Sequence, residues 1–126
     1  MTTTERTPRT TVRTLFDAID AGKLDDVFAL MADNVDFRLG NAAPTHGKQA
    51  FASTTKALFE AIVGIRHDIH NTWEISEDTV VCVMDVHYER RDGRVLTLPC
   101  CNVFRVREGL VHDYRIYMDI TPVLTA

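Results

Sequence analysis

Three segments in the first half of the chain carry apolar residues at helical spacing. The first predicts a helix over 10–21 that Gly22 closes, and a short second helix follows over 24–31. A third helix is expected over 48–63, closed by Gly64. The apolar positions that set the buried faces are Val12, Leu15, Phe16 and Ile19, then Leu24, Val27, Phe28 and Met31, then Phe51, Leu58, Phe59 and Ile62.

The remaining segments alternate with the period of a β-strand. A short strand is expected over 35–39, and its Gly, Asn and Pro content makes 40–47 a loop. After residue 64 come IRHDIHNTWEI, TVVCVMDVHYER, RVLTLPCCNVFRV and LVHDYRIYMD, with Asp92-Gly93 and Glu108-Gly109 as turns between the later segments. Asp-Gly between β-formers is a strong hairpin signal. The order predicts an α+β domain in which helices cover one face of a sheet that ends in a four-stranded antiparallel meander.

The two turns predict which residues share a face of the sheet. If each turn is two residues long, directly opposed residues form three rows on one face. The rows are His87, Leu98 and Asp119; Asp85, Cys100 and Tyr117; Val83, Asn102 and Arg115. We expect the helices to cover this face, so that its polar groups meet in a partly dry cavity. The opposite face, with Cys82, Met84, Val86 and Tyr88 on its first strand, is expected to form a homodimer.

Proton transfer is the chemistry that these polar residues support. An apolar pocket raises the pKa of a carboxyl group toward neutrality, and histidine titrates near neutral pH. We therefore predict that Asp119 and His87 act as the acid and base. Amide and phenol groups can donate hydrogen bonds to an oxygen that gains charge. The predicted substrate-binding residues are Asp85, Asn102, Arg115, Tyr117, His67, Cys100 and Leu98.

Each of these residues also has a structural explanation. Asp119 could end its strand and cap the segment after it, Arg115 could only neutralise a buried acid, and His87 could be a satisfied core histidine. A loop-edge position is an equal alternative for His67. Convergence favours a site, because two acids, a histidine, an arginine, a tyrosine and an asparagine are costly to bury together.

Composition narrows the class of protein. The 126 residues are 45% hydrophobic and 25% charged with a net charge of −4, which indicates one globular domain over 10–126 after a flexible tail over 1–9. Without a basic cluster, a nucleic-acid partner is not expected. Neither a membrane span nor a signal peptide is apparent, so we expect a cytoplasmic protein. The three cysteines lack metal-ligand spacing and are expected to be free thiols, and we expect no metal and no cofactor.

Several stretches resemble the SnoaL-like group of the nuclear transport factor 2-like superfamily. They are LFDAIDAGKLDDVFALMADNVDF, the loop ending in His46-Gly47, and YERRDGRVLTLPCCNVFRVREGLVHDYRIYMD, and the resemblance covers nearly all of 11–123. It implies a cone of curved sheet closed by three helices, with a deep pocket and usually a dimer. Members include polyketide cyclases, ketosteroid isomerase relatives, limonene epoxide hydrolase and proteins that only bind ligands. In the cyclases and the hydrolase, the Asp that Asp119 resembles is the acid or base.

The resemblance to the epoxide hydrolase is incomplete. That enzyme has Arg-x-Asp where this chain has Asp85-Val86-His87, and Tyr-x-Asn where it has Phe37-Arg38-Leu39. We therefore expect acid/base chemistry on a small apolar carbonyl compound, of the cyclase or isomerase kind. The alternatives are a binding protein for a small hydrophobic molecule and, less favoured, an epoxide hydrolase or a dimerisation module with an occluded pocket.

Overall fold

The structure is a computed structural model that describes residues 7–125. In chain order its elements are α1 (Pro8–Asp20), α2 (Leu24–Ala29), β1 (Met31–Leu39), β2 (Thr45–His46), α3 (Lys48–Ala61), β3 (Ile62–Glu74), β4 (Thr79–Arg90), β5 (Val95–Arg107), β6 (Leu110–Tyr117) and α4 (Thr121–Leu124). The predicted order of helices and strands is confirmed, while the short elements β2 and α4 were missed.

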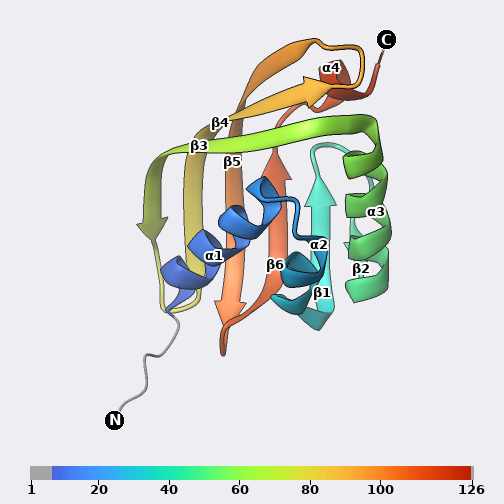
Figure 1. Ribbon diagram of the computed structural model, residues 1–126. Coiled ribbons are helices and arrows are strands. Elements are labelled where there is room, and N and C mark those ends of the chain that lie inside the picture. Colours follow the sequence, from blue (N-terminus) through green and yellow to red (C-terminus); the bar gives the residue numbers. More distant parts are fainter. Residues whose placement is uncertain (1–6, 126) are drawn as a thin grey trace.

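Six strands form one curved sheet in the order β2-β1-β6-β5-β4-β3. The predicted meander from β3 to β6 is antiparallel throughout, whereas β1 joins β6 in parallel. Figure 1 shows α1 and α2 in front of the sheet and α3 beside its β1–β2 edge, with β3 curling across the top. The sheet therefore has an inner face toward the helices and an outer face away from them, and the predicted α+β class is confirmed.

Helix α1 buries the apolar face that its sequence predicts, with Val12, Leu15, Phe16 and Ile19 inside. It begins at Pro8 rather than at residue 10, because Thr7 accepts the cap hydrogen bond and proline is favoured in the first turn. The tail predicted over 1–9 is therefore partly helical at residues 8 and 9. Residues 1–6 of that tail lie outside the described residues.

Helix α3 ends earlier than predicted and leads straight into β3. The β-branched residues Ile62, Val63 and Ile65 favour a strand, so the helix stops at Ala61. Gly64, predicted to close the helix, pairs with Glu89 inside the sheet instead. In the same way, β1 begins at Met31, within the segment predicted to be helical.

Aromatic rings connect the helices to the inner face. The Phe104 ring lies 4.5 Å from that of Tyr114 and 5.7 Å from that of Phe16, between centroids. Phe51 of α3 packs edge-on against Phe37 of β1, with centroids 4.9 Å apart. This packing fixes α1 and α3 over the sheet and encloses the space between them.

Candidate functional site

The β4–β5 hairpin differs from its predicted register by one residue. Its loop contains three residues, Arg91 to Gly93, because Arg90 and Arg94 are hydrogen-bonded and Gly93 adopts the left-handed conformation with φ +87°. An Asp-Gly pair fits this longer loop as well as the two-residue turn. His87 therefore lies opposite Thr97 rather than Leu98. The shift moves the side chains of β4 to the other side of the sheet relative to those of β5.

The β5–β6 hairpin has the predicted turn but a bulge beside it. Glu108 and Gly109 have φ of +55° and +75°, as a two-residue turn requires, and Arg107 lies opposite Leu110. Between Arg105 and Val106 the pairing shifts, so that Arg105 faces Asp113. A β-bulge of this kind reverses which side chains point inward along the rest of the strand.

The two shifts separate the predicted site into two groups. Cys100, Asn102 and His67 line an internal pocket, and Leu98 is half-buried on the same face. The prediction that the other members share this cavity is wrong: Asp85, His87, Arg115, Tyr117 and Asp119 do not line it. The residues assigned to a dimer face, Cys82, Met84, Val86 and Tyr88, are buried inside instead.

Most of the outward polar groups have hydrogen-bond partners, but Nε2 of His87 is buried without one among residues 7–125. His87 Nδ1 lies 2.8 Å from Thr97 Oγ1, and Asp85 Oδ2 lies 3.0 Å from Nε2 of His70. Arg115 donates from Nε to Asp113 Oδ1 at 3.1 Å. These groups form local pairs on the outer face rather than sharing one cavity.

Asp119 follows the last strand and precedes Ile120, the N-cap residue of α4. Its Oδ1 accepts a hydrogen bond of 3.0 Å from the backbone N–H of Thr121, the first residue of α4. Hydrogen bonds from the Thr121 side chain and backbone lower the pKa of the Asp119 carboxyl group. This exposed carboxylate is held at the start of α4 and does not line the pocket.

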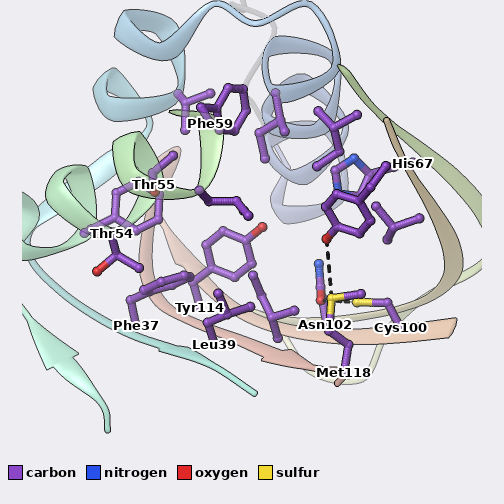
Figure 2. Close-up of a pocket in the computed structure, with 18 residues that line it drawn as sticks. Phe37, Leu39, Thr54, Thr55, Phe59, His67, Cys100, Asn102, Tyr114 and Met118 are labelled. Atoms are coloured by element: carbon purple, nitrogen blue, oxygen red, sulfur yellow. Dashed lines mark hydrogen bonds between the residues drawn. The ribbon is translucent and has the colours of Figure 1, made fainter. Parts of the chain in front are cut away.

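The pocket lies between the inner face, α1 and α3, and its walls are mostly apolar (Figure 2). It encloses about 50 Å³, room for a few water molecules or a small organic group. The aromatic and aliphatic walls come from Ile19, Val27, Phe37, Leu39, Phe51, Leu58, Phe59, Ile65, Val86, Ile116 and Met118. Polar groups are few, so each of them affects what the pocket can bind.

His67 and Asp20 form a hydrogen-bonded pair at one wall. Nδ1 of His67 lies 2.6 Å from Oδ1 of Asp20, and the backbone N–H of His67 donates to the same carboxylate at 3.1 and 3.2 Å. The His67 side chain is 7% exposed, and its ring packs on Phe16 with centroids 4.7 Å apart. Carboxylate and phenyl ring together hold the imidazole in one orientation.

Hydrogen-bond donors occupy other parts of the pocket. Cys100 Sγ donates to Asn102 Oδ1 at 3.1 Å, and the Tyr88 hydroxyl donates to Met118 Sδ at 3.4 Å, as the dashed lines in Figure 2 show. The Tyr114 hydroxyl points into the cavity. Burial raises the pKa of the Cys100 thiol to about 12 and also raises the pKa of both tyrosines. These three groups therefore stay protonated at neutral pH and act as donors.

Asp20 and the two tyrosines were not predicted. Tyr88 and Tyr114 lie on the face that the wrong register assigned to the outside. Asp20 carried a signal, because it lies in the last turn of α1, where the helix dipole disfavours an acid. An unfavourable position of this kind indicates a partner elsewhere in the fold, here the His67 imidazole. Within residues 7–125, no group of three or more His, Cys, Asp or Glu side chains could hold a metal ion.

Fold and pocket define the class of protein: a curved sheet closed by helices around an internal pocket. The family profile of the SnoaL-like domain matches residues 12–114, so the chain belongs to the SnoaL-like domain family. No curated protein sequence matches it. Among the described residues, none of the helices is long and apolar enough to cross a membrane.

Three solved structures show the same fold. An NTF2-like protein of unknown function from Burkholderia pseudomallei is 20% identical, with a TM-score of 0.84 over 94% of this chain and 98% of that one. A provisionally assigned polyketide cyclase from Xanthomonas campestris pv. campestris is 19% identical, with a TM-score of 0.79 over 93% of each chain. An LEH-like epoxide hydrolase from M. tuberculosis is 18% identical, with a TM-score of 0.79 over 93% of this chain and 88% of that one. At these identities the likeness establishes the fold alone.

Proposed function

We propose that this protein is an enzyme that moves protons on a small apolar carbonyl compound, with His67 as general base and Asp20 as its positioning residue. The observation that carries the proposal is the 2.6 Å contact between His67 Nδ1 and Asp20 Oδ1 at the wall of an apolar pocket. The SnoaL-like family and the provisional polyketide cyclase among its structural neighbours support the same reaction class.

The dyad defines which nitrogen does the chemistry. An ionised carboxylate only accepts hydrogen bonds, so Nδ1 of His67 carries the ring proton in the neutral imidazole. The lone pair is then on Nε2. A base held in this way removes a proton from a carbon next to a substrate carbonyl, and Asp20 stabilises the imidazolium that forms. The electron pair of the broken C–H bond forms a carbon–carbon double bond while the π pair of the carbonyl moves to its oxygen, which gives an enolate.

Neutral hydrogen-bond donors in the pocket can stabilise the oxygen of that enolate. The Asn102 side chain and the Tyr114 hydroxyl can donate to an oxygen that gains charge, and donors act most strongly where water is excluded. In an unsaturated ketone whose double bond adjoins the carbon that loses the proton, the imidazolium can return the proton to the far carbon of that double bond, which shifts the double bond into conjugation with the carbonyl. Alternatively, the enolate carbon attacks a second carbonyl in the same molecule and closes a ring, and the imidazolium protonates the new alkoxide.

The volume of the pocket limits the substrate. Sites for drug-sized ligands usually enclose about 300–1,000 Å³, whereas this pocket encloses about 50 Å³. Small ketones therefore suit it best. Larger substrates must displace the half-buried side chains of Leu58 and Phe59 on α3.

A binding protein for a small hydrophobic molecule is the second candidate, favoured by the mostly apolar walls. Epoxide hydrolysis is less favoured. Asp85 and Asp119 do not line the pocket, and the Asp20 carboxylate is already hydrogen-bonded to His67. A carboxylate free to activate water is therefore not found among the residues that line the pocket.

Deuterium exchange at the α-carbons of cyclohexanone, followed by NMR in D₂O, tests the proposal. The protein should accelerate exchange over buffer, and His67→Gln should remove a factor of about 10² to 10⁴ of that acceleration, the usual contribution of a general base. Asp20→Asn should remove part of it. His87→Gln, on the outer face, is the matched control and should change nothing.

The same experiment separates enzyme from binding protein. If cyclohexanone raises the melting temperature while exchange stays at the buffer rate, the binding function replaces the enzymatic one. If His67→Gln exchanges as fast as the wild type, the assigned base is wrong.

A further inference from the structure

A groove on the outer face joins the ends of β1 and β6. It encloses about 390 Å³ and is lined by Arg38, Gly40, Asn41, Arg115, Ile116, Tyr117 and Met118. Arg38 and Arg115 are direct partners in the parallel pairing of the two strands. Their backbones are thus roughly 5 Å apart and both side chains emerge on the same face.

Two cations in register are unfavourable without a counter-charge. Like charges directly opposite one another destabilise a sheet. Arg115 has one carboxylate partner, Asp113, at 3.1 Å. Arg38 donates from Nε to the backbone oxygen of Ala42, and its two Nη atoms have no hydrogen-bond partner among residues 7–125. The Arg38 guanidinium therefore retains unused N–H donors.

The shape of the groove is also fixed by the backbone. Gly40 donates its N–H to Ile116 O at 2.8 Å and has φ +58°. A Cβ at this position would lie 2.7 Å from the backbone oxygen of Met118, so only glycine allows the two strand ends to approach so closely. The Ala42 carbonyl and the Asp113 carboxylate accept hydrogen bonds from Arg38 and Arg115 and hold their guanidinium groups beside this part of the groove.

We propose that Arg38 and Arg115 form a binding site for a single carboxylate or phosphate group on a small molecule. Guanidinium groups bind such anions through paired N–H donors. The Tyr117 hydroxyl and Asn41 line the same groove and add further polar groups. This inference is independent of the chemistry proposed for the inner pocket.

Neighbouring acids restrict the ligand to one anionic group. Asp36 and Asp113 are themselves strand partners, one row away from the two arginines on the same face. A polyanion such as a nucleic acid would meet these carboxylates, and the whole chain carries a net charge of −4. A compact anion can bind the two arginines without reaching the carboxylates of Asp36 and Asp113.

NMR titration of the full chain at low salt tests the site, with inorganic phosphate and acetate as separate probes. We expect saturable shifts in the Arg38 and Arg115 Nε–H and Gly40 amide signals. Arg38→Gln and Arg115→Gln should each weaken binding by at least about tenfold. Arg13→Gln is the matched control, because Arg13 is an exposed arginine beside a single acid, Asp17, and it should leave binding unchanged.

A gain of affinity provides the second test. Asp113→Asn removes the carboxylate that competes for Arg115, so it should tighten binding several-fold, a result that misfolding cannot mimic. Saturation by only one of the probes identifies the group that the site prefers. The proposal fails if neither probe saturates, if Arg13→Gln weakens binding as much as Arg38→Gln, or if Asp113→Asn leaves binding unchanged or weaker.

Discussion

The two faces of strands β4, β5 and β6 use polar side chains in opposite ways. On the outer face, charged groups are numerous, and several lie in pairs such as His70–Asp85 and Arg115–Asp113. On the inner face polar groups are few, and they line an apolar pocket. An exposed charge costs little free energy because water solvates it. A buried polar group destabilises the fold unless it has a hydrogen-bond partner, so its presence indicates a functional role. A few polar groups in a buried pocket are therefore a better guide to a site than many on an open face.

Truncating a side chain on the inner face should lower the free energy of unfolding far more than truncating one on the outer face, and this is the largest effect we expect. Phe104 is fully buried against Phe16 and Tyr114, so Phe104→Ala should lower the free energy of unfolding by about 3–5 kcal/mol. Tyr117 on the outer face is 54% exposed, and Tyr117→Ala should cost less than about 1 kcal/mol. Urea denaturation measures both. Similar losses would mean that the Tyr117 side chain is buried in solution.

Alkaline pH should destabilise the protein through the inner face. Burial raises the pKa of Cys100 from 9.0 to about 12, and also raises the pKa of Tyr88 and Tyr114. The folded state then holds protons that the unfolded state releases above about pH 9. The contribution of these groups to the free energy of unfolding is fully present below about pH 9. It falls as pH rises, by up to about 1.4 kcal/mol per pH unit for each group.

Urea denaturation at pH 8, 9, 10 and 11 measures this slope. Tyr88→Phe removes one of the three groups and should make the decline shallower between pH 10 and 11. A stability that is constant up to pH 11 would contradict the burial of these groups.

The outer face should also mediate self-association. Trp73 and Val83 are 47% and 37% exposed there, and Val81 and Val103 extend the apolar area. We predict a homodimer through these residues rather than through Cys82, Met84, Val86 and Tyr88, which are buried inside. Sedimentation should show that Val83→Asp is monomeric, while Val63→Asp, an exposed control at the start of β3, stays dimeric. A wild-type monomer at micromolar concentration would contradict the prediction.

The smallest effect is expected at Asp119. Because the Asp119 side chain accepts a hydrogen bond from Thr121 at the start of α4 and does not line the pocket, Asp119→Asn should leave α-proton exchange unchanged and lower the melting temperature only slightly. The lowered pKa of Asp119 means that its contribution is present above its ordinary pKa of 3.8 and is lost as pH falls through the folded value. The melting-temperature difference between variant and wild type should therefore disappear in acid. A large loss of exchange would mean that Asp119 takes part in catalysis.

Local patterns predicted the elements well, because the apolar spacing of α1 and the turn at Glu108-Gly109 depend on neighbouring residues only. The sheet faces could not be predicted in the same way. An Asp-Gly pair fits both a two- and a three-residue loop, and the bulge before Asp113 leaves no mark in the sequence. One-residue shifts reverse a face, so His87 was placed inside and Tyr114 outside. His67 and Asn102 were identified, while Asp20 depends on a contact 47 residues away in the chain.

The most direct test of the inner pocket as the functional site is a long-range ¹H–¹⁵N NMR spectrum of the histidine side chains, recorded with and without cyclohexanone. We predict that neutral His67 carries its proton on Nδ1, and that the ketone shifts the Nε2 signal of His67 while the signals of His87 stay in place. A proton on Nε2 of His67, or a ketone response at His87 alone, would contradict the account.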